Sequence, residues 1–395
     1  MTEPVPDLEE PQATRSPAAR STLPPMRLRR LAVMGSVIST ILLVVNGMVC
    51  ATWSHFSGIP GWLAWQVIPG SLAVAFIPTT ILGFRYSNLL LRVVYAVSAA
   101  WIGTLNFLFF AAVACWIAAI PDGLAGWPLP RVDLGAILFG AAFLIAGYGV
   151  VNAMWLRVTR VTIPLPNLPE AWQGHTVALV TDLHLGHLSG PRFLRRVISR
   201  LRSLQPDAVL ISGDMFDGTT LHIDYLVAPW RDYSAPRGIF YVTGNHDEFA
   251  DRGIYLDAVK RTGIRVLHNE KVSVQDLQFV GVHDSEAGDP EELRRILRQA
   301  HLDPLRPSVL LAHRPVNLSV AEEEGISLQL SGHTHGGQVW PWNLLVSRIY
   351  GRFAHGLARL NKLQVYTSYG VGTWGPPLRV ATKSEMVLIR FEKAC

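Results

Sequence analysis

The sequence predicts a four-helix transmembrane region followed by an α/β domain, and the distribution of charge is the first observation behind this prediction. Residues 31–156 contain only five Lys, Arg, Asp or Glu residues in 126 positions. Residues 157–395 hold 27 of the 35 basic and 24 of the 30 acidic residues. We therefore expect a disordered cytoplasmic tail over 1–30, four transmembrane helices over 31–156, a linker over 157–171 and a globular domain over 172–395.

The four membrane segments are uncharged apolar runs of at least 22 residues each. About 20 helical residues cross a hydrocarbon core of roughly 30 Å, so each run is long enough to span. A buried helical bundle of a soluble protein is the alternative, but it needs charged outer faces, which these segments lack. The predicted spans are residues 31–53, 62–84, 93–120 and 134–156.

Arginines beside the spans predict the orientation of the chain in the membrane. They flank the first span, the connection between the second and third, and the end of the fourth, whereas the opposite side has only Arg131. The positive-inside rule then places both termini and the globular domain in the cytoplasm, with a multi-pass anchor in the inner (plasma) membrane. A cleaved secretory signal is the competing interpretation of the first span, but this run lacks a small-residue cleavage site. The arginines on the predicted cytoplasmic side are Arg27, Arg29, Arg30, Arg85, Arg92, Arg157 and Arg160.

Net charge and cysteine content exclude several function classes. The net charge of +5 is spread along the chain, so no concentrated basic face points to nucleic acid. The three cysteines, Cys50, Cys115 and Cys395, form no CxxC motif. Neither a disulfide framework nor a thiolate zinc site is therefore expected. The sequence makes no prediction about the oligomeric state.

Short apolar runs alternate with amphipathic segments after residue 157, which favours a layered α/β fold. Three prolines between residues 163 and 169 predict an extended connector before the first strand. Helices are expected at 192–204 and near 254–262 and 291–300. Strands are expected at 176–181, 208–212, 239–243, 279–282, 309–312, 327–330, 364–367 and 386–389.

Polar side chains follow five of these strands, at the point where each strand ends. In open α/β sheets, ligand-binding groups gather outside the carboxyl ends of the strands. Each motif taken alone has an ordinary structural explanation, such as a turn, a helix cap or a buried core histidine. Their joint occurrence in order favours one shared site. The motifs are Asp182-Leu183-His184, Gly213-Asp214, Gly244-Asn245-His246-Asp247, His313, and Gly332-His333-Thr334-His335-Gly336-Gly337-Gln338.

In this order the motifs resemble those of the calcineurin-like metallophosphoesterases, and the resemblance covers about residues 172–391. The stretches 336–338, 369–373 and 377–379 are similar to the membrane-associated bacterial branch of that family. No ligand position departs from the family pattern. The resemblance implies a layered β-sandwich for the domain and a metal-dependent phosphoric ester hydrolase activity. Phosphodiesterase activity is one expectation, and the choice between mono- and diesterase stays open.

Seven nitrogen and oxygen ligands without a thiolate are too many for one tetrahedral zinc site, so two divalent ions fit better. Mn, Fe or Zn suit this mixture of imidazole and carboxylate. Two such ions can clamp a phosphoryl group and activate a bridging water, which predicts hydrolysis of a phosphoester or pyrophosphate. The resemblance implies that the first ion is held by Asp182, His184 and His335, that the second is held by Asn245, His313 and His333, and that Asp214 bridges both.

Among the histidines of the five motifs, His246 is the one that this scheme assigns to no metal. The resemblance implies that it contacts the phosphoryl group and protonates the leaving oxygen, with Asp247 orienting it. A helix N-cap is the alternative role for Asp247. Asp217 is expected to end a turn, with support of the bridging loop as the alternative. Arg379 is expected on the solvated surface, with a contact to a phosphate as the alternative. His187, His222, His283 and His355 match no ligand motif and are expected to be structural.

The leading functional hypothesis is a membrane-anchored dinuclear phosphohydrolase, with a lipid or lipid-linked phosphoester as the preferred substrate because of its location. A hydrolase of soluble phosphodiesters or nucleotides, tethered by the same spans, is the alternative within this class. A non-catalytic membrane sensor would be expected to have lost ligand residues, and none is lost. A transporter would be expected to carry intramembrane charges, which are absent from the interiors of the four segments.

Overall fold

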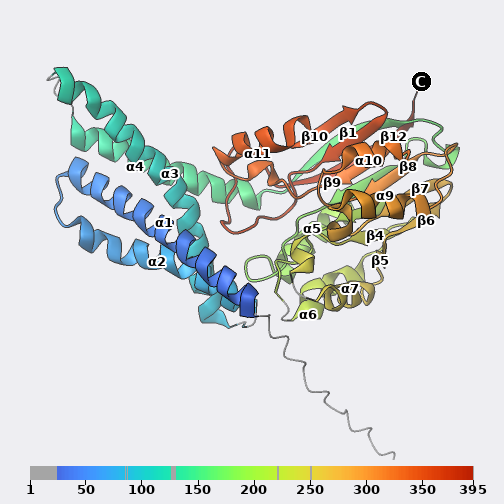
Figure 1. Cartoon of the computed structure of the whole chain (residues 1–395), viewed down its shortest axis with the longest axis horizontal. Helices are drawn as coiled ribbons and strands as arrows, with labels where there is room; N and C mark the ends of the chain where they lie inside the picture. The colour runs from blue at the N-terminus through green and yellow to red at the C-terminus, as the bar shows by residue number, and fades with distance from the viewer. Residues whose placement is uncertain are drawn as a thin grey trace, which may run out of the picture.

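The computed structural model describes residues 25–84, 86, 88–125, 130–219, 222–249 and 251–394. Four long helices form one part of the molecule and two β-sheets with their covering helices form the other (Figure 1). Most of the expected N-terminal tail, residues 1–24, lies outside the described residues. Residues 25–30, also expected in that tail, instead begin the first helix.

The four helices are long and apolar enough to cross a membrane. Their outward side chains are largely apolar; Ile68 is 74% exposed and Leu144 is 76% exposed. Such a surface is unfavourable in water and suited to lipid. α2 continues through Pro69 and Pro78, which neighbouring helices tolerate in membrane bundles. The helices are α1 (Pro25–Ser57), α2 (Trp62–Gly83), α3 (Leu89–Ala125) and α4 (Arg131–Met154).

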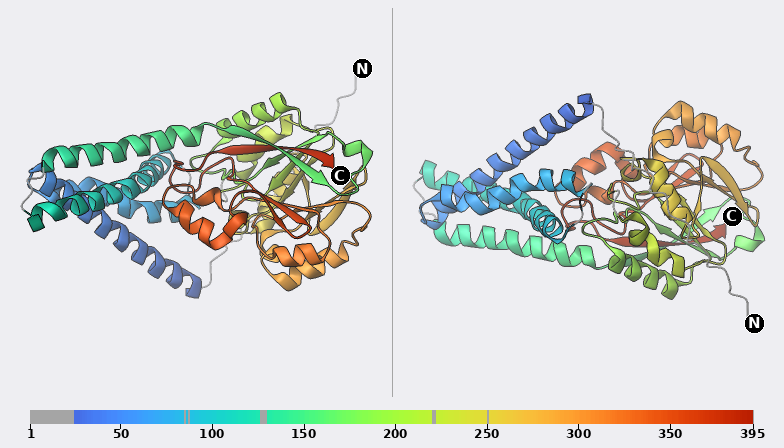
Figure 2. Two further views of the ribbon diagram at one scale, coloured as in Figure 1. Left: turned by 90° about the horizontal axis from the view of Figure 1, so that it is seen from above. Right: turned by 90° about the horizontal axis from the view of Figure 1, so that it is seen from below.

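The end of the bundle away from the sheets contains the α1–α2 connection, the C-terminal end of α3 and the N-terminal end of α4 (Figures 1 and 2). The end of α2, the start of α3 and the end of α4 lie beside the sheets. This alternation agrees with an even number of crossings. Inside the bundle, the buried rings of Phe56 and Phe139 pack with Leu105 and Leu108 of α3.

Two six-stranded sheets form the second part of the molecule. The first sheet has the order β1-β12-β2-β3-β4-β5, with β2, β3 and β4 parallel. Its strands are β1 (Arg157–Leu165), β2 (Thr176–Val180), β3 (Ala208–Ser212), β4 (Ile239–Val242), β5 (Arg265–Val266) and β12 (Glu385–Lys393).

The second sheet has the order β10-β11-β9-β8-β7-β6, with β7, β8, β9 and β11 parallel. Its outer strands β10 and β6 pair antiparallel with their neighbours. The strands are β6 (Glu270–Val274), β7 (Leu277–Gly281), β8 (Ser308–Leu311), β9 (Leu328–Ser331), β10 (Gly356–Leu360) and β11 (Leu363–Thr367).

The sheets pack face to face, with Leu210 and Phe240 of the first against Phe279 and Leu330 of the second. Trp172, fully buried, contacts Phe279 with ring centroids 5.6 Å apart. Strands such as β3 are buried along their whole length because helices cover the outer faces as well. The covering helices are α5 (Pro191–Leu204), α6 (Ile223–Val227) and α7 (Arg252–Lys260) on the first sheet and α8 (Asp284–Ala287), α9 (Pro290–Gln299) and α10 (Leu318–Glu323) on the second.

The structure differs from the sequence prediction at the expected linker. Residues 157–165 form β1, which pairs in parallel with β12 along nine residues. Pro164 fits there because β1 is an edge strand, where one missing backbone donor is tolerated. Only Trp155 and Leu156 separate α4 from this strand, so the sheets begin directly at the end of the helix bundle.

The segment between β9 and β10 adjoins the helix bundle, as does the segment between β11 and β12 (Figure 1). It contains a short turn, η4 (His335–Gly337), followed by α11 (Trp342–Tyr350) and a second turn, η5 (Gly351–Phe353). Three further short turns are η1 (Glu170–Trp172), η2 (Ala228–Asp232) and η3 (His246–Glu248).

Candidate metal centre

The structure brings the seven predicted ligand side chains together where five strands end. The loops that carry them follow β2, β3 and β4 of the first sheet and β8 and β9 of the second. Parallel neighbours end at one edge of a sheet, and the face-to-face packing places the two edges side by side. The polar residues that follow these five strands in the sequence therefore lie together in one cluster.

The first group consists of Asp182, His184 and His335, all buried. One ligand atom from each lies within 4.8 Å of the other two. The Nε2 atoms of the two histidines are 3.1 Å apart, and His335 Nε2 is 3.4 Å from Asp182 Oδ1. This spacing leaves room for one cation among the three side chains.

The second group consists of Asp214, His313 and His333, with the same mutual spacing. Asn245 joins it, because its Oδ1 lies 2.8 Å from His333 Nδ1. His313 Nδ1 lies 2.8 Å from the Ser212 carbonyl, to which it can donate, so its Nε2 faces the group. Metal-binding histidines are commonly oriented by such a bond.

Asp214 lies between the two groups. Its Oδ2 is 3.1 Å from His313 Nε2 and 3.8 Å from His184 Nε2. Its Oδ1 accepts a hydrogen bond from the His246 backbone amide at 2.9 Å. This carboxylate is thus held in place by backbone while facing imidazoles of both groups.

The backbone at the site is unusual for non-glycine residues. Asp182, His184, Asp214, His333 and His335 all have φ between 46° and 67°. Left-handed conformations cost of order 1 kcal/mol or more and cluster at functional sites. The loops are so close that a Cβ on the glycine at 244 would lie 2.2 Å from Asp214 Oδ1.

Burial and mutual charge shift the pKa values of these groups in opposite directions. Burial raises the pKa of Asp182. Burial also opposes ionisation of Asp214, but His313, His184 and His246 together lower its pKa below the usual range. Burial opposes protonation of His313, yet the charge of Asp214 and Asp182 raises the pKa of His313 to about 10. A proton on His313 thus compensates the buried carboxylates, and a cation can take over this role.

The donor set fits two divalent ions. Carboxylate, imidazole and amide ligands without sulfur suit Mn, Fe or Zn, and the buried carboxylates need positive charge nearby. The two groups each supply three or four donors, and Asp214 can serve both. Protein ligands in this number and spacing are what a two-ion site requires.

Comparison with known proteins agrees with this geometry. Residues 175–337 match the profile of the family described as calcineurin-like phosphoesterase. The domain belongs to that family. The match begins one residue before β2 and ends within the Gly-His-Thr-His-Gly-Gly segment, so it includes all five ligand loops.

Several curated relatives resemble this phosphoesterase domain. An uncharacterized metallophosphoesterase of Campylobacter jejuni is 32% identical over 60% of this chain and 63% of its own. A transmembrane protein with metallophosphoesterase domain from Danio rerio is 33% identical over 64% of this chain and 61% of its own. An uncharacterized metallophosphoesterase of Helicobacter pylori is 33% identical over 54% of this chain and 59% of its own. The chain thus spans about three fifths of the length of these relatives.

His246 of the phosphoesterase domain lies beside the first ligand group, with its ring centroid 4.8 Å from that of His184. The exposed rings of Phe249 and Trp374 flank it at 4.4 and 5.6 Å. Burial and the neighbouring His184 lower the pKa of His246 to about 4. Its Nδ1 has no hydrogen-bond partner among the described residues. His246 therefore places a neutral imidazole with a free ring nitrogen beside the first ligand group.

Asp247 of the phosphoesterase domain differs from both expected roles. Its carboxylate accepts hydrogen bonds from the backbone amides of Gly244, Met215 and Phe216, at 2.9, 3.2 and 2.8 Å. It therefore ties the loops after β3 and β4 together and makes no described hydrogen bond to the His246 ring. The short turn at 246–248 turns the carboxylate back toward these amides.

Asp217 and Arg379 are two functional candidates that the sequence prediction missed. Asp217 Oδ1 lies 3.6 Å from His184 Nδ1, so the carboxylate faces a ligand instead of only ending a turn. Arg379 is fully buried, and its Nη2 lies 3.0 Å from His335 Nδ1. The carbonyls of Tyr369 and Gly372 accept from the same nitrogen at 2.7 and 2.6 Å. Arg379 is thus a support of the ligand loop, contrary to the expected surface position.

The four histidines expected to be structural lie outside the two ligand groups. His187 faces the Gly83 carbonyl of α2 at 2.6 Å, and the backbone amide of Thr243 donates to His283. His222 precedes α6, and the ring of His355 is stacked on that of Tyr369. These positions agree with the expected structural roles.

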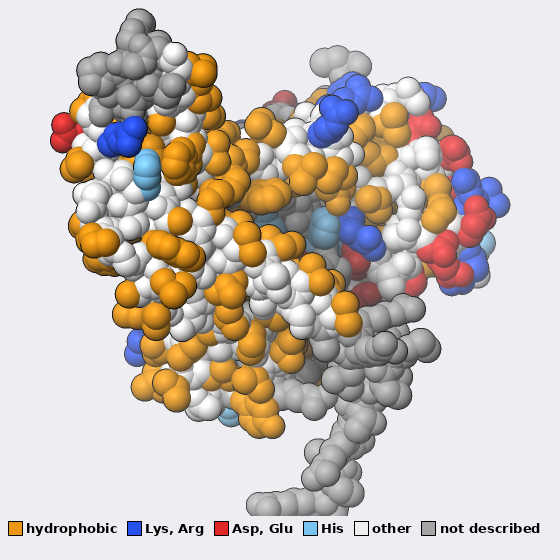
Figure 3. Space-filling model, turned by 60° about the vertical axis from the view of Figure 1, so that its left-hand side comes forward, with side chains coloured by type: hydrophobic (Ala, Val, Ile, Leu, Met, Phe, Trp, Pro, Cys, Tyr) orange, Lys and Arg blue, Asp and Glu red, His pale blue; other side chains and the backbone are white. Residues whose placement is uncertain are grey.

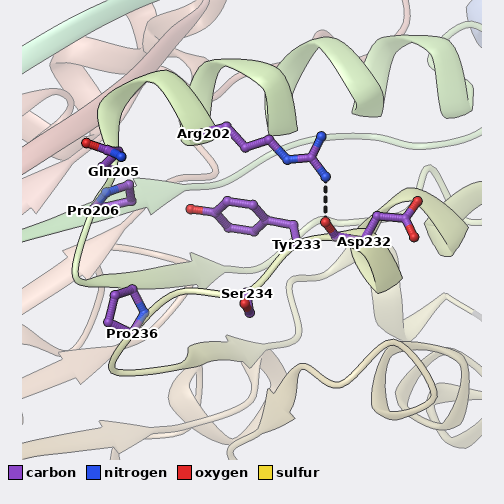
Figure 4. A pocket seen from close by; sticks show the side chains of 7 residues that line it. All are labelled: Arg202, Gln205, Pro206, Asp232, Tyr233, Ser234 and Pro236. Carbon is purple, nitrogen blue, oxygen red and sulfur yellow. Dashed lines mark hydrogen bonds between the residues drawn. The ribbon is translucent and has the colours of Figure 1, made fainter.

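A surface hollow of about 480 Å³ lies elsewhere in the phosphoesterase domain (Figure 4). It is formed by the segments that enter β3 and β4, whereas the ligand loops leave the opposite ends of these strands. In it Arg202 donates to the Asp232 carbonyl. The hollow is therefore separate from the metal centre.

Proposed function

We propose that the chain is a membrane-anchored metallophosphoesterase that hydrolyses a phosphoester or pyrophosphate with two divalent ions. The observation that carries this proposal is the position of Asp214 between two groups of buried ligands. We assign Asp182, His184 and His335 to one ion, Asn245, His313 and His333 to the other, and Asp214 to both. When bound, the two ions would supply an activated water and charge stabilisation for the phosphoryl group.

The residues of the chain have separate tasks in this proposal. Asp214 fixes the relative positions of the two ligand groups, and Asp247 fixes the loop that carries Asn245 and His246. His246 stands beside the first group with a free nitrogen, so it can hydrogen-bond the phosphoryl group. The negative charge of a bound phosphoryl group favours the protonated imidazole, which can then deliver its proton to the leaving oxygen. Phe249 and Trp374 shield that imidazole from water.

Removing the metal tests the proposed reaction directly. The full-length protein, purified in detergent, is expected to hydrolyse bis(4-nitrophenyl) phosphate and to lose this activity after dialysis against a chelator. Adding back Mn²⁺, Fe²⁺ or Zn²⁺ is expected to restore it. Hydrolysis that persists at the same rate in the chelated, metal-free protein would contradict the proposal.

We further propose that the four helices anchor the protein in the inner (plasma) membrane with the phosphoesterase domain in the cytoplasm. Supporting this, α2 ends and α3 begins beside the domain, Arg92 lies in the first turn of α3, and the fourth helix leads directly into β1. A lipid or lipid-linked phosphoester is the substrate class that this location favours.

Reporter fusions test the proposed orientation. A fluorescent protein fused after residue 395 is expected to fluoresce, and alkaline phosphatase at the same place is expected to be inactive. The pattern is expected to reverse for fusions after Gly61, between α1 and α2. Active phosphatase at residue 395 would place the domain outside the cytoplasm.

A further inference from the structure

One helix of the phosphoesterase domain exposes an apolar face. No residue of α11 is buried, although the helix contains five large apolar side chains and Tyr350. Trp342, Leu345 and Ile349 recur at helical spacing on one face and are 52%, 49% and 65% exposed. Helices of water-soluble domains normally bury such a face, so the exposed face of α11 indicates an interaction surface.

The charge around α11 is also unlike that of the rest of the domain. Residues 325–384 contain six Lys or Arg and no Asp or Glu. Residues 157–324 contain 19 basic and 22 acidic residues. Arg348 and Arg352 are exposed, and neither forms an ion pair with a described residue. The segment therefore suits an anionic partner.

Hydrogen bonds and ring contacts hold the N-terminal end of α11 against the helix bundle. Asn106 of α3 donates from its Nδ2 to the Trp340 carbonyl at 2.9 Å and accepts from Trp342 Nε1 at 3.1 Å. The rings of Phe110 and Trp340 lie 4.8 Å apart. Nearby, Asn152 of α4 donates to the Arg379 carbonyl at 2.8 Å. These contacts fix where α11 lies relative to the membrane helices.

The contacts with α4 place the start of α11 near the domain-side end of the fourth span. The Trp340 amide donates to the Val380 carbonyl, and the amide of the adjoining Arg379 donates to the Gly149 carbonyl. Gly149 follows the start of α4 by 18 residues, which at 1.5 Å per residue is about 27 Å, close to the roughly 30 Å of the bilayer core. α11 therefore begins close to the boundary between acyl chains and headgroups on the domain side.

Figure 3 shows the same continuity on the surface. Hydrophobic side chains cover the helix bundle and continue onto the adjoining part of the domain, whereas acidic and basic groups gather on the part farther away. Tryptophan and arginine together are characteristic of the membrane interface, where an apolar body and a polar or charged tip are both satisfied.

α11 is also connected to the metal centre. Four residues separate it from the turn that carries His335, and the ring of Tyr350 lies 6.3 Å from that of His333. A Cβ on the glycine at 337 would meet the backbone of Asn343 at 2.4 Å, so the helix lies directly on the ligand loop. A surface that touches α11 is therefore close to the reacting phosphoryl group.

We propose that α11 is an interfacial helix whose Trp342, Leu345 and Ile349 enter the headgroup region of an anionic phospholipid bilayer, with Arg348 and Arg352 on lipid phosphates. The metal centre then opens at the membrane surface, and a lipid phosphoester reaches it without leaving the bilayer. This inference rests on the membrane anchoring proposed above. A second copy of the chain is the competing occupant, but two copies would bring their basic segments together without acidic partners.

A fluorescent label on the apolar face tests this inference. The full-length chain carries Cys395→Ser and Leu345→Cys, is labelled with bimane and is placed in nanodiscs of phosphatidylcholine and phosphatidylglycerol brominated at carbons 6 and 7. Label emission is expected to fall by about half relative to unbrominated lipid. The matched control is Leu305→Cys, which is 75% exposed and precedes β8, at the opposite end of that strand from His313. Its emission is expected to change by less than about a tenth.

Charge and oligomeric state complete the test. Quenching at position 345 is expected to weaken in phosphatidylcholine alone and in the combined Arg348→Gln, Arg352→Gln variant. Equal quenching of the parent label in mixed lipid, of the same label in phosphatidylcholine alone and of the double variant would refute the anionic-lipid preference. A label at 345 quenched by aqueous iodide like that at 305 overturns the inference. Protection from both quenchers in a protein that elutes as a dimer assigns the face to a second copy.

This readout is independent of catalysis. A chain with no hydrolytic activity still shows lipid quenching at position 345 if the helix lies in the interface. Conversely, hydrolysis of soluble bis(4-nitrophenyl) phosphate that is retained without lipid quenching refutes the interfacial helix and leaves the proposed reaction standing. Equal elution volumes of both labelled variants and the parent chain verify the fold.

Discussion

The Asp214→Asn variant is expected to lose hydrolysis of bis(4-nitrophenyl) phosphate by about 10³-fold or more. The substitution keeps the size of the side chain and the acceptor for the His246 amide, but it removes the charge that faces both ligand groups. Two-ion stabilisation of phosphoryl transfer is worth several kcal/mol, which is about 10³-fold in rate. The measurement is kcat/KM of the full-length protein in detergent at saturating Mn²⁺.

Asp276→Asn is the matched control for this variant. Asp276 carries the same side chain at a positive φ of 69°, but it lies in the turn between β6 and β7, where it pairs with Arg306 and is 64% exposed. Its kcat/KM is expected to stay within about twofold of the unmodified protein, because exposed ion pairs contribute little. An Asp214→Asn variant as active as this control would refute the assignment of a shared carboxylate.

The His246→Gln variant is expected to lower kcat by about 10²- to 10⁴-fold on a phosphoester with a poor leaving group. The loss on a nitrophenyl ester is expected to be smaller, because that leaving group needs less protonation. The metal content is expected to stay unchanged, since His246 lies outside the two groups assigned to the ions. Rates on both esters and metal analysis of the same preparation provide the measurement.

His301→Gln serves as the control for a lost imidazole, because His301 is exposed and remote from the ligand loops. Its rates on both esters are expected to match those of the unmodified protein. If His246→Gln slows both esters equally and also loses metal, His246 supports the metal centre and does not act as a general acid.

The central strands were predictable from sequence because both of their faces are buried. β3, with five consecutive buried residues, and β8, with four, appear as short apolar runs between turns. The edges of the sheets were not predictable in the same way. β5 has two residues, and β10 alternates between partly buried and exposed positions. β1 was hidden by its proline, which an edge strand accepts.

The candidate site was predictable where its residues directly follow strands. Asp182 and Asp214 lie immediately after buried runs, so the α/β sheet brings them together. Arg379 could not be found in this way, because it lies 44 positions after His335 in the chain. The role of Asp247 depends on how two loops approach each other, which no local pattern encodes.

α11 shows why exposure matters for interpreting such a pattern. Its apolar face resembles that of a helix covering a sheet, yet the structure leaves it exposed and places its first residue against α3. The sequence alone does not distinguish a face that packs on a sheet from one that meets lipid. The bonds of Trp340 to Asn106 and Val380 make this distinction, because they hold the start of the helix beside α3 and the end of α4.

The position of bound ions in crystals of the full-length protein soaked with Mn²⁺ tests the dinuclear site most directly. Anomalous difference maps are expected to show two peaks about 3.5 to 4 Å apart, one beside Asp182, His184 and His335 and the other beside Asn245, His313 and His333, with Asp214 between them. A single peak, or two peaks without Asp214 between them, would contradict the shared-carboxylate site.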